Sequence, residues 1–143
     1  MISCRQAGSR QRSATKFSPI TNCFMRHDRA YLADIIEACQ HIGSFVSGRD
    51  LADLDSDVLL RSGIFHQLAV IGEAASRIST ELRDRHPELA WRQISGMRNY
   101  IAHAYFSLDL RIVWETATMD VPNLRITVLR LSDAEFGHDD VIQ

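Results

Sequence analysis

Apolar residues recur at intervals of three and four along most of the chain, which is the spacing of one face of an α-helix. Four stretches carry the pattern, at about residues 25–46, 58–78, 88–104 and 107–131. No stretch alternates apolar and polar residues as a half-buried strand would. The sequence therefore predicts an all-α fold, a bundle of four main helices.

Polar and helix-breaking residues separate these stretches. An acidic connector at residues 50–57 precedes the second helix, and Asp55 or Ser56 can cap that helix. A short helical turn is expected over residues 80–85. It ends before Pro87, because the residue that precedes a proline disfavours helix.

The fourth stretch contains a proline, and the second contains a charged pair. Ser107 is a candidate cap for the fourth helix. Pro122 either kinks that helix or restarts it as a first-turn residue. Glu73 and Arg77 are four residues apart, so they can pair on the second helix.

Length and charge limit the classes of function. A chain of 143 residues forms one domain. It has no apolar run near the roughly 18 residues that span a bilayer. Of the net charge of −2, residues 1–24 contribute +4 and the remainder −6. The acidic remainder argues against a broad electrostatic nucleic-acid binder, so any RNA contact has to be local.

The first 24 residues lack helical periodicity and are rich in Ser, Arg, Gln and Thr. They have three interpretations: a transit peptide, a basic nucleic-acid-binding arm, or a start annotated upstream of Met25. We expect residues 1–24 to be a disordered, dispensable leader, 25–132 to be the helical domain, and 133–143 to be a polar tail.

The cysteines indicate the compartment. Cys4, Cys23 and Cys39 are an odd number and form no C-x-x-C pair. This argues against a disulfide framework and against a zinc site. We expect a cytoplasmic protein without a membrane anchor.

The candidate functional residues are Arg98, Asn99, His103 and Tyr105. Arginine presents a planar fork of donors to a phosphate, and histidine moves protons near neutral pH. Asn99 and His103 share a helix face, whereas Arg98 lies about 140° from His103. No metal-ligand set accompanies them, so metal-free cleavage of an RNA phosphodiester suits the set. From the residues alone, the alternative stays open that they form a solvated face or a satisfied structural pair, which is the usual role of an Arg and a His on one helix.

A resemblance extends from about Met25 to Leu131. It rests on five ordered segments: Val70–Ala74, His86-Pro87-Glu88 to Trp91–Ile94, Gly96-Met97-Arg98-Asn99, His103-x-Tyr105, and Asp109-Leu110 with Ile112-Val113-Trp114. In these the chain resembles the HepT-like group of HEPN-domain proteins, the toxin halves of type VII HepT–MntA toxin–antitoxin pairs. The family signature is an Arg followed four to six residues later by a His, which Arg98 and His103 match.

The resemblance implies a HEPN-like helical homodimer and an endoribonuclease without cofactor or metal, whose nucleophile is the RNA 2′-hydroxyl. By the same resemblance His103 transfers protons, Arg98 binds the scissile phosphate, and Asn99 orients its neighbours. Tyr105 matches the tyrosine that the MntA-like nucleotidyltransferase antitoxin modifies with AMP. Ala104 departs from the glycine of many relatives. A non-catalytic HEPN subunit that binds nucleotide or the nucleotidyltransferase, and a purely structural helical dimer, are the alternatives.

Overall fold

The computed structural model describes residues 19–104, 107 and 109–137; within that part, the side chains at 19–26, 103 and 104 lie outside the description. In chain order the elements are α2 (Pro19–Val46), α3 (Leu51–Ser56), α4 (Val58–Arg77), α5 (Thr80–Arg85), α6 (Trp91–Ala104), α7 (Leu110–Glu115), the π-helical turn η1 (Thr116–Asp120) and α8 (Val121–Phe136). All described regular elements are helical, and α2, α4, α6 and α8 are the longest. The expected all-α fold with four main helices is confirmed.

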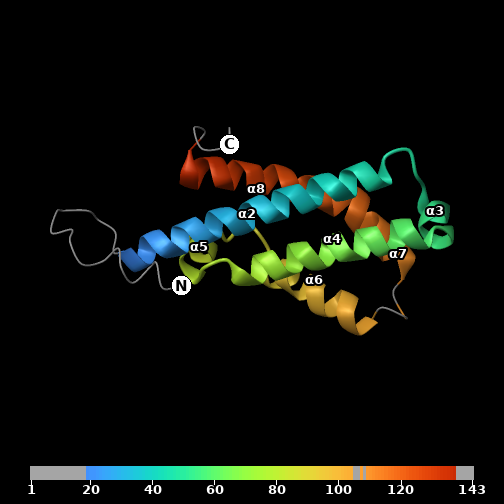
Figure 1. Cartoon of the computed structure of the whole chain (residues 1–143), viewed down its shortest axis with the longest axis horizontal. Coiled ribbons are helices and arrows are strands. Elements are labelled where there is room, and N and C mark those ends of the chain that lie inside the picture. The colour runs from blue at the N-terminus through green and yellow to red at the C-terminus, as the bar shows by residue number, and fades with distance from the viewer. Residues whose placement is uncertain (1–18, 105–106, 108, 138–143) are drawn as a thin grey trace.

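The four main helices follow one another across the molecule (Figure 1). Helix α2 packs against both α8 and α4, and α4 packs in turn against α6. The spatial order is therefore α8, α2, α4, α6. Helix α6, which carries most of the candidate motif, lies at one side of this row and rests on α4.

The core lies between these helices and consists mainly of aliphatic side chains at helical spacing. Its most completely buried large members are Leu32, Ile35, Ile42, Leu54, Ile64, Leu68, Ile71, Ile78, Leu82, Val121 and Val128. Helix α6 joins the core through Trp91, Ile94 and Ile101, three residues on one face that are each less than a tenth exposed. This one-sided burial fixes the rotation of α6 about its axis and leaves its other side open to solvent.

The acidic connector at 50–57 contains a helix that the periodicity did not reveal. Helix α3 is only six residues long, too short for a repeat of three and four to appear. Asp50 and Asp53 form a capping box at its start. The prediction that Asp55 or Ser56 caps α4 is wrong, because Asp57 accepts hydrogen bonds from the first amides of that helix.

Three other boundaries differ from the expected ones. Helix α2 begins at Pro19 rather than at Met25, with proline as its first helical residue. Helix α6 begins at Trp91 rather than at about residue 88. Asp109, not Ser107, caps α7, since the Asp109 carboxylate accepts from the amide of Arg111.

The C-terminal helix confirms one expectation and exceeds another. Pro122 stands in the first turn of α8, directly after the π-helical turn η1, so the expected restart falls at the change from one helix type to the other. The helix runs on to Phe136, past the expected end of the domain at residue 132. Gly137 stops it with φ of 76°, a backbone conformation that favours glycine. The division at residues 24 and 132 stays a prediction.

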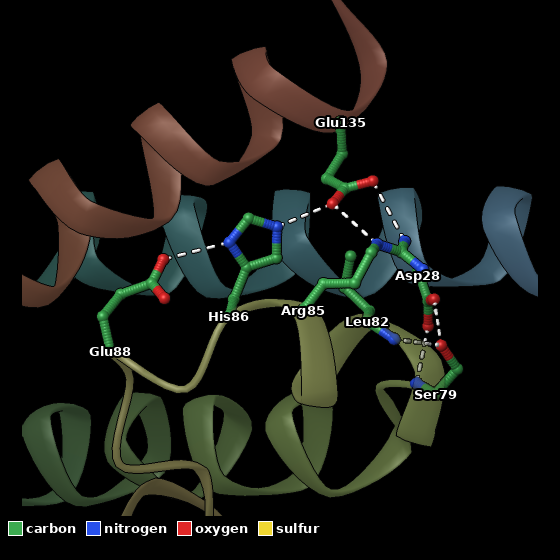
Figure 2. Close-up of polar contacts among 7 residues, drawn as sticks. All are labelled: Asp28, Ser79, Leu82, Arg85, His86, Glu88 and Glu135. Atoms are coloured by element: carbon green, nitrogen blue, oxygen red, sulfur yellow. Dashed lines mark hydrogen bonds and ion pairs between the residues drawn. The ribbon is translucent and has the colours of Figure 1, made fainter.

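A polar cluster ties α5 to its neighbours (Figure 2). The buried carboxylate of Asp28 on α2 accepts from the Ser79 amide at 2.8 Å and from the Ser79 hydroxyl at 2.5 Å. Ser79 is itself the N-cap of α5. At the other end of α5, Arg85 donates two hydrogen bonds of 3.0 Å to Glu135 of α8.

The same cluster holds the start of α6. His86 follows α5, and its ring lies 2.6 Å from Glu135 and 3.0 Å from Glu88. Its backbone carbonyl accepts from the indole N–H of Trp91, the first residue of α6, at 2.8 Å. The cluster therefore determines where α6 begins.

Among the helices that the structure describes, none combines the length and the apolar character needed to cross a bilayer.

Candidate functional site

Arg98 and Asn99 are residues of α6 whose side chains reach solvent. Both residues are exposed, and so is the neighbouring Tyr100. Ile101 follows them but turns into the core. Since α6 is anchored by its buried face, the polar side chains project from a fixed support. An arginine in this position is accessible to a dissolved polyanion.

The backbone beneath Arg98 lies unusually close to α4. A Cβ atom placed on Gly72 would lie 2.6 Å from the Arg98 amide nitrogen and 3.1 Å from its Cβ. No other residue type fits there without a shift of one helix. Gly72 therefore sets the separation of α4 and α6 at the point where Arg98 leaves the helix.

The residue after Gly72 contacts the Arg98 side chain. The carboxylate of Glu73 accepts from Nη1 of Arg98 through one oxygen and from Nε of Arg77 through the other, the latter at 2.8 Å. The expected pair of Glu73 and Arg77 is confirmed. The hydrogen bond from Arg98, followed by that from Arg77, holds the pKa of the Glu73 carboxyl below its usual value. The group is thus a carboxylate shared by two guanidinium groups.

A groove of about 400 Å³ adjoins Glu73. It lies between α2 and α4 and is lined by Tyr31, Asp34, His66, Ala69, Val70, Glu73, Ala74 and Arg77. Hydrogen bonding to Glu73, and then to Tyr31, raises the pKa of Arg77 above its already high value, so this guanidinium stays charged. The groove therefore places apolar side chains and the charged Arg77 beside the Glu73 carboxylate.

The other residues of the motif are described only in part. His103 belongs to α6, five residues after Arg98, which puts it about 7.5 Å further along the axis and about 140° around it. Its side chain lies outside the described part of the structure, as does the whole of Tyr105. The structure thus brings Arg98 and Asn99 to one surface, and the roles of His103 and Tyr105 stay predictions.

Sequence reasoning found the Glu73–Arg77 pair but missed the link from Glu73 to Arg98. The two residues are 25 positions apart and come together only because α4 and α6 pack in register. The usable signal was Gly72 beside Glu73, because an interior helical glycine often marks a close approach of another backbone. Among the residues that the structure describes, no group of three or more His, Cys, Asp or Glu could hold a metal ion.

Cys39 is not a candidate nucleophile. Its thiol is a free, buried group on α2. Burial raises its pKa to about 12, although the positive charge of Arg125 acts in the opposite direction. A thiol with such a pKa carries almost no thiolate at neutral pH.

Comparison with known proteins shows which family the sequence resembles. The model of the family described as "Ribonuclease HepT-like" matches residues 35–131, a span that contains Arg98, Asn99, His103 and Tyr105. The chain is 35% identical over 100 residues to the "Probable ribonuclease HepT" of Thermococcus cleftensis. The alignment covers 70% of this chain and 91% of that protein.

A second relative is similar over its whole length. It is named "Putative RNase TTE0752" in Caldanaerobacter subterraneus subsp. tengcongensis, and it is 32% identical over 111 residues, 78% of this chain and 99% of that protein. No solved structure gives a significant match. The match to the family model covers more than half of the chain, and the alignments to the two relatives cover 78% and 70% of it.

Proposed function

The chain belongs to the ribonuclease HepT-like family, and from this membership we propose that it is an endoribonuclease that cleaves RNA without a metal ion. In the proposed reaction the 2′-oxygen of a ribose attacks the adjacent phosphorus. The bond from phosphorus to the 5′-oxygen of the next nucleotide breaks. The products are a 2′,3′-cyclic phosphate and a 5′-hydroxyl, and water is not consumed in this step.

The observation that carries the proposal is the setting of Arg98. Its side chain is 48% exposed, contacts Glu73 through the guanidinium, and stands on a helix that is held in place by its buried face. A guanidinium can bind the scissile phosphate and stabilise the charge that develops on its oxygens. His103 follows on the same helix, and an imidazole can take the proton of the 2′-hydroxyl or give one to the 5′-oxygen.

Asn99 and a second copy of the chain complete the proposed site. Asn99 lies four residues before His103, so both belong to one side of α6. In the proposal the Asn99 amide orients the imidazole or the substrate. Helix α6 lies at the side of the helix row with Tyr100 45% exposed, which suits a two-fold contact between copies. A homodimer would bring two Arg98–His103 sets to one RNA strand.

We further propose that the enzyme is a toxin neutralised by a nucleotidyltransferase antitoxin. In this proposal the antitoxin transfers AMP from ATP to the hydroxyl of Tyr105, and pyrophosphate leaves. Tyr105 comes directly after α6, two residues beyond His103. An attached AMP adds bulk and negative charge next to a phosphate-binding site, and both repel RNA.

The second candidate is a non-catalytic HEPN subunit that binds a nucleotide or the nucleotidyltransferase. The observation that favours it is the charge of the body, −6 for residues 25–143. Long RNA gains little from such a surface, whereas a small ligand or a protein partner needs no broad positive field. Cleavage itself separates the two candidates.

The deciding experiment is an RNA cleavage assay with EDTA present. The full chain is compared with Arg98→Ala and His103→Ala on a mixed-sequence RNA oligonucleotide, with the DNA oligonucleotide of the same sequence as the second substrate. Arg130→Ala, an exposed arginine of α8, is the matched control for lost positive charge. We expect the chain and the control to cut the RNA and leave the DNA intact, because only RNA carries the nucleophile.

Loss of a transition-state contact to phosphate typically costs about 10²–10³-fold in rate, which is the drop expected for Arg98→Ala. Loss of the proton-transfer group costs about 10²–10⁴-fold, expected for His103→Ala. Circular dichroism checks that both variants keep their helices. An unmodified, folded parent that leaves RNA intact contradicts the ribonuclease and favours the binding subunit.

A further inference from the structure

Glu73 is an acidic residue in the midst of a site proposed to bind a polyanion. Its carboxylate contacts Arg98 of α6 and Arg77 of its own helix. A carboxylate repels phosphate, so its position calls for an explanation. Exposed ion pairs contribute little to folding stability, and both arginines are about half exposed or more. Stability alone does not account for it.

The geometry of the contact restricts Arg98 rather than neutralising it. Glu73 engages one terminal nitrogen of Arg98, and the guanidinium has further N–H donors on its other edge. Arg77 holds the second oxygen of Glu73, so the carboxylate is fixed from both sides. The trio keeps a net charge of one positive unit.

The backbone supports the same arrangement. Gly72 lets the Arg98 backbone approach α4 so closely that a Cβ at position 72 would meet its amide nitrogen at 2.6 Å. Glu73 is the next residue along α4, and it therefore reaches the guanidinium without leaving its own helix. A flexible arginine side chain loses much of its freedom in this contact before any substrate arrives.

We propose that Glu73 is a positioning residue that holds the Arg98 guanidinium in the orientation in which its free edge meets the scissile phosphate. This inference rests on the proposed ribonuclease activity and adds to it a residue on a second helix. Glu73 touches neither substrate nor reacting atoms, and it acts through Arg98. Its cost is a local repulsion of RNA, and its benefit is an arginine aligned for the transition state.

The balance predicts a particular kinetic signature. Glu73→Gln keeps the size of the side chain and removes its charge, so Arg98 loses its anchor while the repulsion of RNA also falls. We expect kcat to fall by about 10–100-fold and KM to stay equal or decrease, because the lost interaction acts in the transition state. Glu73→Asp keeps the charge on a shorter arm, and it should recover part of kcat.

The experiment measures kcat and KM on an RNA oligonucleotide with EDTA, for the full chain, Glu73→Gln and Glu73→Asp. Glu37→Gln on α2 is the matched control, an exposed glutamate that faces a histidine one turn away. Glu73→Gln is also made in an Arg98→Ala background, and its rate is measured under single-turnover conditions in which losses of about 10³-fold remain measurable. If Glu73 acts through Arg98, Glu73→Gln causes no further loss there.

Each outcome has a distinct meaning. An active parent, an impaired Arg98→Ala and a fully active Glu73→Gln overturn the positioning role alone. A Glu73→Gln variant that is faster than the parent also overturns it, since the carboxylate then only blocks phosphate. Equal losses from Glu73→Gln with and without Arg98 assign Glu73 a separate role. A folded parent that does not cleave RNA overturns the proposed activity, and the positioning role with it.

Discussion

The backbones of α4 and α6 come close together where Gly72 faces Arg98. The Arg98 amide nitrogen lies where a side chain on residue 72 would begin, at 2.6 Å from an ideal Cβ. The obstacle is backbone, which cannot swing aside as a flexible side chain does. The position of the candidate phosphate-binding arginine thus depends on the absence of a single methyl group on the neighbouring helix.

Gly72→Ala should therefore destabilise the protein although alanine is the better helix former. Overpacking of a tight contact typically costs about 1–3 kcal/mol, and the gain in helix propensity of about 1 kcal/mol does not offset the upper part of that range. Helix α6 has to shift away from α4, so the proposed cleavage should fall by more than the loss of folded protein explains. Urea denaturation and the RNA assay measure the two effects.

Gly43→Ala is the matched control for that substitution. Gly43 is also an interior helical glycine, and a Cβ there meets nothing within 4 Å. Alanine at this position should stabilise the protein by about 0.5–1 kcal/mol. If Gly72→Ala gave the same gain, the close contact between α4 and α6 would be absent in solution.

The buried carboxylate of Asp28 gives a second stability prediction. It accepts two hydrogen bonds from Ser79 and so joins α2 to the first turn of α5. Asp28→Ala leaves the partly buried amide and hydroxyl of Ser79 without this partner, which should lower the free energy of unfolding by about 1–3 kcal/mol. Asp34→Ala, an exposed residue of the same helix, should change it far less. Urea denaturation of both variants makes the comparison.

Long, amphipathic segments of this chain were predictable, and short segments defined by their caps were not. The stripe from Leu60 to Ile78 reveals α4 because many buried residues repeat at one spacing. Helix α3 was not predicted, because six residues with one buried leucine are too few to show a periodic pattern. Its start is defined by the capping box of Asp50 instead. Helix ends such as Asp57 depend on which of several acids can reach the free amides, and that is a matter of backbone geometry.

The site divides in the same way. Arg98 and Asn99 were identified from residue type and spacing along one helix, and both are exposed as such a role requires. The contact of Glu73 with Arg98 joins two helices, and sequence spacing has no bearing on it. It follows from the register of α4 on α6, which Gly72 permits. Contacts between elements need packing information that a single sequence does not contain.

The proposed regulation predicts a resistant variant. Tyr105→Phe removes the hydroxyl that would accept AMP, and it leaves Arg98, Asn99 and His103 in place. We expect it to cleave RNA like the parent and to stay toxic when a cognate nucleotidyltransferase is co-expressed. Growth assays and mass spectrometry of the intact chain provide the measurement. Tyr100→Phe on α6 is the control, and it should gain the mass of AMP and lose toxicity. Neutralisation of Tyr105→Phe would remove Tyr105 from the regulation.

His86 gives a prediction about pH. Burial is the largest single influence on its pKa and lowers it, but the hydrogen bonds and charges of Glu135 and Glu88 together raise it above the ordinary value. A raised pKa in the folded state means that the protonated ring stabilises the fold. That contribution is complete below the unfolded pKa of about 6.5, and it is lost as pH rises through the folded value.

The free energy of unfolding of the parent should therefore exceed that of His86→Gln by more at pH 6 than at pH 8.5, because glutamine cannot take up a proton. Glu135 supplies the closest contact to the ring, at 2.6 Å. In a Glu135→Gln background the effect of His86→Gln should depend much less on pH, and urea denaturation at the two pH values measures both differences. A difference that grows toward pH 8.5 would mean that the neutral ring is the stabilising form, and the start of α6 would then rest on the contact of Trp91 with the His86 carbonyl.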